Sequence, residues 1–259
     1  MTKATKWLIV IGVLLHMSLP VQARELIIVG VPAPPMRYFD EQKNLKGFDI
    51  EVIDFILTRR LGLKYTVKLI DSSPRIKKEC QKGHFDILLS FSHKEERSIY
   101  LIYPKESHVS VAWHFFILKK NAGKIVFNTY EDLKGWRIGA TAGKSYTPAF
   151  WEAGKSFLKL DIMATDEPQI RKLLKGRIDA VPLETASALY EARTGRYLNQ
   201  ITYLKKPIKR KPYYNTFVKN SPYPNLDKLM KMYDRELKEM KGNGTLAALQ
   251  RKYGLEVSD

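Results

Sequence analysis

Residues 26–31 read LIIVGV, and this stretch gives the first indication of the fold class. The apolar run ends in the Gly- and Pro-rich sequence of residues 30–35, which is typical of a buried strand followed by a turn. Strands buried on both faces occur mainly in parallel sheets that helices cover on either side. An α/β architecture is therefore the first expectation.

The segments that follow alternate between strand and helix patterns. Residues 48–61 place their apolar side chains on one helical face, and residues 65–69 alternate between apolar and polar. A short helix over 74–82 then leads to a second buried strand over 85–90. The order strand, helix, strand, helix, strand predicts a mostly parallel sheet with helices packed on both faces.

An aromatic and β-branched segment over 109–118 leads into a second α/β block. Two strands at 201–204 and 213–218 close this block, and we interpret the basic segment 205–211 between them as a solvated loop rather than a binding patch. The other expected elements are strands at 137–140, 161–163 and 178–183, helices at 146–153, 167–175 (with Asp166 as N-cap) and 185–193, and two C-terminal helices separated by Gly242-Asn243-Gly244.

Residues 1–23 have the layout of a cleavable signal peptide. Two early lysines precede an apolar run over 7–15, and Ala23 comes directly before Arg24. The run is much shorter than the roughly 20 apolar residues of a membrane span, so we expect cleavage after Ala23 and no membrane anchor. The single cysteine, Cys80, lies far from this point and cannot accept a lipid there. We therefore expect a periplasmic, secreted protein that is not lipid-anchored.

The chain of 259 residues has a formal net charge of +17. So basic a composition would suit a nucleic-acid-binding protein. Export argues against that class, and apart from 205–211 the basic residues are spread along the chain. We expect no nucleic-acid partner, a monomer, and a charge that favours anionic ligands.

Four segments carry a resemblance to a known family. They are Pro34-Pro35-Met36 with residues 45–52, residues 83–86 running into Glu96-Arg97 and Tyr103-Pro104, residues 131–139 with Gly143, and residues 242–246 with Tyr253-Gly254. In this order and spacing the chain resembles the solute-binding protein family 3, the periplasmic amino-acid-binding type that forms the substrate-binding component of ABC transporters.

The resemblance implies a fold and a division of the chain. The fold is the two-lobed periplasmic binding protein of type II, in which each lobe is a mostly parallel sheet flanked by helices. The lobes and their connections would be 24–106 and 214–259 for lobe 1, 113–207 for lobe 2, and 107–112 and 208–213 for a hinge of two crossings. The expected site is the cleft beyond the carboxyl ends of the strands.

Arg97 is the first candidate for ligand contact. It occupies the position of the family arginine that binds an α-carboxylate, and a guanidinium presents paired N–H donors that match a carboxylate. Because Glu95 and Glu96 adjoin it, a surface arginine is the alternative. Ser92 takes the place of a family threonine that helps to hold the carboxylate, and Ser90 would contact the ligand through its backbone.

Glu184 is the second candidate, with two interpretations open. It matches a family acid that pairs with the ligand's α-ammonium, although the family usually has aspartate there. It also comes directly before Thr185, where an acid would favour the N-terminus of the next helix.

The wall around the rest of the ligand departs from the family pattern. Ala33 stands where an aromatic residue usually covers the ligand, so other side chains, Trp113 among them, would line the pocket. A loop at the start of the second lobe's first helix offers backbone N–H groups to an anion. The remaining expected pocket residues are Met36, Tyr38, Gly143, Ser145 and Tyr146.

The resemblance thus implies capture of a small carboxylate-bearing solute, an amino acid or analogue, for import by an inner-membrane ABC permease. An orphan periplasmic sensor of the same fold and a cyclohexadienyl-dehydratase-like enzyme are the alternatives. His84, His93, His108 and His114 show neither metal-ligand spacing nor pairing with a nucleophile. We expect no catalytic residue, no metal and no cofactor.

Overall fold

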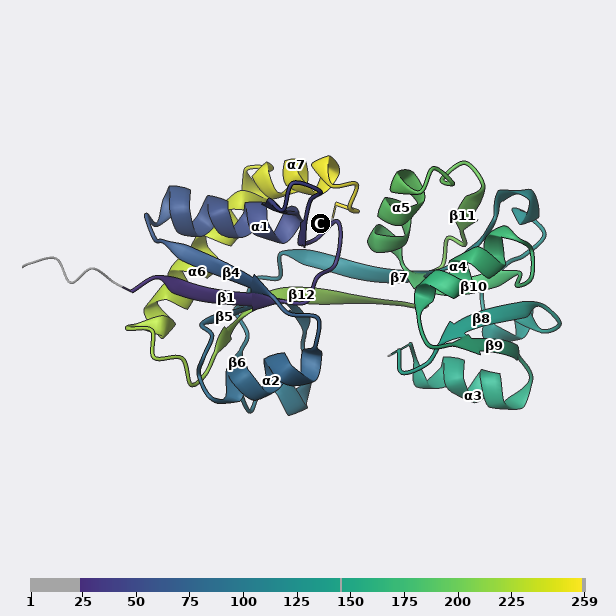
Figure 1. Ribbon diagram of the computed structural model, residues 1–259, viewed down its shortest axis with the longest axis horizontal. Helices are drawn as coiled ribbons and strands as arrows, with labels where there is room; N and C mark the ends of the chain where they lie inside the picture. The colour runs from purple at the N-terminus through teal and green to yellow at the C-terminus, as the bar shows by residue number, and fades with distance from the viewer. Residues whose placement is uncertain (1–23, 145, 258–259) are drawn as a thin grey trace, which may run out of the picture.

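The computed structural model describes residues 24–144 and 146–257, and it has two lobes that lie side by side along the long axis (Figure 1). Two long strands, β7 (Val109–Leu118) and β12 (Lys209–Val218), run between the lobes. The predicted signal peptide over 1–23 and the candidate Ser145 lie outside the described residues. The α/β architecture with two lobes is confirmed.

The bounds of the elements are as follows. The other strands are β1 Leu26–Gly30, β2 Tyr38–Phe39, β3 Leu45–Lys46, β4 Tyr65–Leu69, β5 Ile87–Ser92, β6 Leu101–Ile102, β8 Arg137–Thr141, β9 Lys159–Met163, β10 Ala180–Glu184 and β11 Ile201–Tyr203. The helices are α1 Phe48–Ile53, α2 Ser73–Gln81, α3 Pro148–Ser156, α4 Asp166–Leu174, α5 Thr185–Thr194, α6 Leu226–Gly242 and α7 Thr245–Lys252. A π-helical segment, Asp54–Arg60, extends α1, and a 3₁₀ turn, Glu95–Arg97, follows β5.

One sheet passes through both lobes in the order β4-β1-β5-β12-β7-β10-β8-β9. The strands β4, β1 and β5 are parallel in one lobe, and β10, β8 and β9 are parallel in the other. Between them β12 and β7 pair with each other in antiparallel fashion over 209–213 and 109–113. This paired stretch is the connection between the lobes, and the carboxyl ends of the parallel strands on both sides point toward it.

Each lobe has its own hydrophobic core. Buried residues of the first lobe come from the two ends of the chain, as Phe48 of α1 and Tyr233 of α6 show. Buried residues of the second lobe come from the middle of the chain, with Phe115 and Phe150 among the largest. Cys80 is fully buried in the first lobe, where it lies with Ile76 among the buried residues of α2. Among the described residues no helix combines the length and apolarity of a membrane span.

Glycine is required where the chain enters α1. The φ of Gly47 is +130°, and a Cβ there would lie 2.3 Å from the carbonyl oxygen of Met36. Any other residue would be strained and would push the Met36 loop away from the helix. This close approach holds Met36 and its neighbours against α1.

Three local expectations were wrong. The basic segment is not a loop throughout, because residues 209–211 belong to β12. Asp166 is the first residue of α4 and not its N-cap, which is Thr165. The helix expected over 48–61 is α-helical only to Ile53 and then widens into the π-helical segment, a change that the residue pattern does not indicate.

Candidate ligand site

Arg97 lies at the carboxyl end of β5, where the chain leaves the sheet in a 3₁₀ turn. Its Nη1 donates to the carbonyl oxygen of Ser92 at 2.7 Å and to the Ser92 hydroxyl at 3.3 Å. The guanidinium carbon lies 4.9 Å from the centre of the Phe91 ring, and the Tyr103 hydroxyl donates to the same Ser92 carbonyl at 3.1 Å. These contacts fix the guanidinium beside Ser92, so two of the predicted residues are brought together.

Tyr213 is a site residue that the sequence analysis missed. It lies directly opposite Ser92 in the pairing of β12 with β5. Burial raises the pKa of Tyr213, while its hydrogen bond with Ser92 and the positive charge of Arg97 oppose the rise. The negative charge of Glu184 also acts on this phenol. Tyr213 therefore lies beside Ser92 on the Arg97 side of the cleft.

Glu184 ends β10, and its carboxylate caps α5. One carboxylate oxygen accepts from the N–H of Ala186 at 3.0 Å and the other from the N–H of Ser187 at 2.9 Å. The interpretation of Glu184 as an acid at the helix N-terminus is thus confirmed, and contact with a ligand ammonium stays a prediction. Together with Met36, Glu184 lines a pocket of about 120 Å³ between the lobes.

Two further predicted residues are placed by aromatic contacts. The Tyr38 ring, from the first lobe, lies 5.5 Å from the Tyr190 ring of α5 in the second lobe, so the two lobes touch at this point. Tyr146 is buried in the core of the second lobe, and its hydroxyl accepts from the N–H of Thr141 at 3.1 Å. Its ring lies edge-on to Trp113 at 6.4 Å. Gly143 is exposed, with a φ of +72°.

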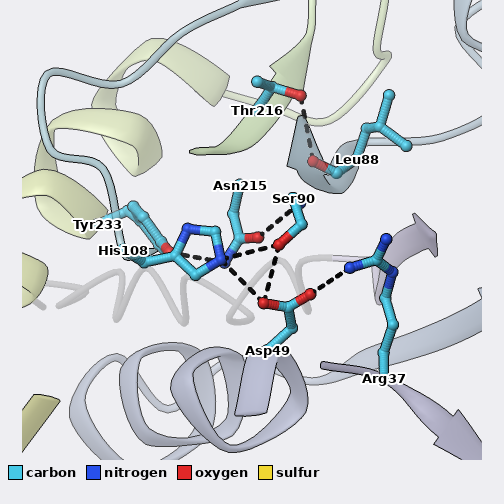
Figure 2. Close-up of polar contacts among 8 residues, drawn as sticks. All are labelled: Arg37, Asp49, Leu88, Ser90, His108, Asn215, Thr216 and Tyr233. Carbon is cyan, nitrogen blue, oxygen red and sulfur yellow. Dashed lines mark hydrogen bonds and ion pairs between the residues drawn. The ribbon is translucent and has the colours of Figure 1, made fainter. Parts of the chain in front are cut away.

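Ser90 belongs to a buried polar network (Figure 2). Its hydroxyl donates to Asp49 at 2.9 Å, and its N–H donates to Asn215 at 3.1 Å. Arg37 donates to the other Asp49 oxygen at 2.5 Å, and His108 Nε2 lies 2.9 Å from the oxygen that Ser90 contacts. The Ser90 hydroxyl and N–H are therefore engaged inside the protein, and the predicted backbone contact with a ligand stays a prediction.

Within this network the pKa of Asp49 is lowered. Burial alone would raise it, but the hydrogen bond to His108 and the charge of Arg37 outweigh burial. Sequence analysis had no signal for these partners, because Arg37, Asp49 and His108 come from three separate segments. Arg37 fits because residue 30 is glycine: a Cβ there would lie 2.7 Å from Arg37 Nε.

The Asp49, His108 and Ser90 side chains do not form a catalytic triad. In such a triad the histidine contacts the serine with one ring nitrogen and the carboxylate with the other. Here both partners contact the same Nε2, at 3.0 Å from Ser90 and 2.9 Å from Asp49. The Ser90 side chain is also buried. Within 24–144 and 146–257, no group of three or more His, Cys, Asp or Glu side chains could hold a metal ion.

The sequence matches the family model of the bacterial extracellular solute-binding proteins, family 3, over residues 27–256. The "Probable amino-acid-binding protein YxeM" of Bacillus subtilis (strain 168) is 26% identical over 219 residues, which cover 83% of this chain and 78% of that protein.

Two solved structures share the fold. The second substrate-binding domain of a putative amino acid ABC transporter from Streptococcus pneumoniae has a TM-score of 0.71 at 20% identity, covering 89% of this chain and 99% of that one. A histidine kinase sensor domain with similarity to periplasmic binding proteins has a TM-score of 0.67 at 19% identity, covering 90% of this chain and 96% of that one.

Proposed function

Because the chain belongs to the bacterial extracellular solute-binding proteins, family 3, we propose that it captures a small carboxylate-bearing solute between its lobes. An amino acid or a close analogue is the ligand class, in keeping with the Bacillus relative, a probable amino-acid-binding protein. The observation that carries the proposal is the Arg97 guanidinium, which Ser92 holds at the carboxyl end of β5. Ligands of open α/β sheets bind at this end of the strands.

Arg97 would bind the ligand carboxylate. The hydrogen bonds to Ser92 use Nη1, and we assign the Nε–Nη2 edge to the carboxylate, because two parallel N–H groups match its two oxygens. The Tyr213 hydroxyl and the Ser92 side chain would complete this end of the cleft.

The rest of the ligand would lie toward the second lobe. Met36 and Glu184 line the pocket there, and Tyr38 meets Tyr190 across the cleft. The exposed Gly143 would approach the ligand when the lobes close. Tyr146 would not contact the ligand directly but would support the pocket wall. Its ring packs against Trp113, and its hydroxyl accepts a hydrogen bond from the N–H of Thr141.

Binding would favour closure of the lobes about the two connecting strands, and an inner-membrane ABC permease would recognise the closed form. The hinge would comprise 107–112 and 208–213, with the lobes divided at those points. The chain would act as a monomer in the periplasm, after removal of residues 1–23 to leave Arg24 as the first residue.

A second candidate function is ligand sensing by the same fold, which the histidine kinase sensor domain favours. Capture and closure would be unchanged, and a receptor would replace the permease as the partner. Crosslinking of the ligand-bound protein in cells separates the two, since it recovers either a permease or a receptor. An enzymatic role is not proposed, because the one serine, histidine and aspartate cluster of the described chain lacks the geometry of a triad.

Replacing Arg97 by alanine tests the proposed function. The Arg97→Ala protein should lose the thermal shift that carboxylate ligands give the unchanged protein, because it lacks the paired donors. The matched control is Arg75→Ala, an exposed arginine of α2 in the same lobe, which should keep the shift. An intact shift in Arg97→Ala would show that the site is assigned wrongly.

A further inference from the structure

The pocket of about 120 Å³ between the lobes has walls that are mostly apolar, and both lobes and a connecting strand form them. The first lobe contributes Met36 and Leu255, both of which belong to its hydrophobic core. The second lobe contributes Ala186 and Leu189 of α5. Residues 109–112 of β7 form the wall between these two sides. A molecule in this pocket would therefore contact both lobes at once.

Strand pairing connects this pocket with the proposed carboxylate site. Val109, which lines the pocket, lies directly opposite Tyr213 in β12, and Tyr213 lies directly opposite Ser92 in β5. Directly opposite residues of an antiparallel pair have their side chains on the same face of the sheet. Because Ser92 holds Arg97, this row leads from the arginine to the pocket across two strand spacings, or about 10 Å. That interval leaves room for the carboxylate and the α-carbon of a single amino acid.

The charged side chains of the pocket walls have partners that leave none for a ligand side chain. Two carboxylates, Glu184 and Glu256, line the pocket, and within the described parts of the chain its lining includes no lysine, arginine or histidine. Glu256 forms an ion pair with Arg210 of β12. Glu184 accepts backbone N–H groups at the start of α5, and the α-ammonium group of an amino acid would balance its remaining negative charge.

The uncharged polar groups of the walls offer few hydrogen bonds. The Thr185 hydroxyl donates to the carbonyl oxygen of Ala112 at 2.9 Å and lies 2.7 Å from Nδ1 of His114. Besides the Ser110 hydroxyl and the Tyr203 phenol, the other lining side chains are apolar. A polar ligand side chain in this pocket would replace few of the hydrogen bonds that it makes to water, and that loss weakens binding.

The volume of the pocket limits the size of the side chain. An apolar cavity of about 150 Å³ holds benzene, which has six carbon atoms. From the lining and the volume we infer that the pocket binds the side chain of the ligand, and that the ligand is an amino acid with an aliphatic side chain of about three to five carbon atoms. The inference rests on the proposed function, because Arg97 binds the α-carboxylate of this molecule.

Charged side chains would bind less well in this pocket. A second carboxylate would lie close to Glu184 and Glu256, which would repel it. A cationic side chain would have to compete with Arg210 for Glu256, or with the ligand's own ammonium group for Glu184. An aliphatic side chain removes both its own apolar surface and that of the walls from water. The pocket therefore selects for aliphatic amino acids.

Isothermal titration calorimetry with amino acids of matched shape tests the inference. L-leucine, L-asparagine and L-aspartate have side chains of the same shape that differ in polarity and charge, and L-lysine is the cationic probe. The unchanged protein should bind L-leucine about 10- to 100-fold more tightly than L-asparagine, because burial of the leucine methyl groups is favourable. L-aspartate and L-lysine should also bind more weakly than L-leucine.

Leu189→Asn makes the same exchange of polarity in the pocket wall. It should weaken the binding of L-leucine about 10-fold and reduce the preference for L-leucine over L-asparagine. The matched control is Leu174→Asn, because Leu174 is also partly buried against the same core of the second lobe but lies outside the pocket lining. The control should keep both affinities, and circular dichroism checks that the two variants are folded.

Ala186→Leu fills part of the pocket from α5. It should weaken the binding of L-leucine about 10-fold, because the enlarged wall occupies the space of the side chain, while L-alanine should bind as it does to the unchanged protein.

Three results would overturn the inference and leave the proposed function standing. They are binding of L-asparagine, L-aspartate or L-lysine at least as tightly as L-leucine, equal effects of Leu189→Asn and Leu174→Asn on L-leucine binding, and unchanged binding of L-leucine by Ala186→Leu. Binding of none of these amino acids to the unchanged protein would contradict both the inference and the proposed ligand class.

Discussion

Asp49 is the residue on which the interior of the first lobe depends most. Its carboxylate is fully buried and contacts Arg37, Ser90 and His108, and through Ser90 it reaches Asn215 of β12. This network holds the end of β5, from which Ser92 and Arg97 project. Asp49 thus acts on the site by positioning the strand that carries it.

Replacing Asp49 by asparagine should lower the free energy of unfolding by about 3–5 kcal/mol, because Arg37 would then be a buried charge without its counter-charge. The control is Asp54→Asn, which removes an ion pair with Arg59 (2.9 Å) that is partly exposed on both sides. It should cost at most about 1 kcal/mol. Urea titration measures both, and equal, small losses would contradict the role given to Asp49.

The pH dependence of the protein's stability should reflect the lowered pKa of Asp49. A carboxyl whose pKa is lower in the folded state contributes stability above its unfolded pKa, near 4, and loses that contribution as the pH falls through the folded value. The unchanged protein should therefore lose stability below about pH 4 more steeply than Asp49→Asn. If both proteins lost stability equally as the pH falls, the lowered pKa of Asp49 would be contradicted.

The role of a single residue can be predicted from the sequence when the residues it contacts are close to it along the chain. Arg97 and Ser92 are five positions apart, and the structure brings them into contact, while their contact with a ligand stays a prediction. Tyr213 was missed because its place beside Ser92 comes from the pairing of two strands that are far apart in the sequence.

The N-terminus of α5 shows how one side chain can serve an element. Both Glu184 oxygens accept backbone N–H groups that would otherwise lack partners at a helix start. Glu184→Ala should lower the free energy of unfolding by about 1 kcal/mol, as for the loss of other N-caps. Glu184→Gln keeps one acceptor oxygen and should cost less. Chemical denaturation of both variants and the unchanged protein measures these losses. Equal stability of the three proteins would contradict the capping role of Glu184.

Most elements could be predicted from the sequence because apolar periodicity and turn residues mark them locally. The strand β7 has the bounds expected, 109–118, and α5 begins at the residue expected. The start of β12 could not be predicted, since Lys209, Arg210, Lys211 and Pro212 have low strand propensity. Pairing with β7 in the connection between the lobes overrides that local preference.

At the scale of the whole molecule, two separately packed lobes share one sheet through β7 and β12 (Figure 1). Ser92, which holds Arg97, pairs with Tyr213 at one end of this paired stretch. Glu184 lies beside Trp113 at the other end. A ligand that bridges the two ends contacts both lobes at once, so its binding energy can favour the closed arrangement.

Small-angle X-ray scattering with and without a saturating carboxylate ligand tests closure on a carboxylate most directly. The probe is the carboxylate ligand that gives the unchanged protein the largest thermal shift. We expect a smaller radius of gyration for the unchanged protein with this probe, and no change for Arg97→Ala at the same concentration. An unchanged radius at saturation, or compaction that persists in Arg97→Ala, would contradict it.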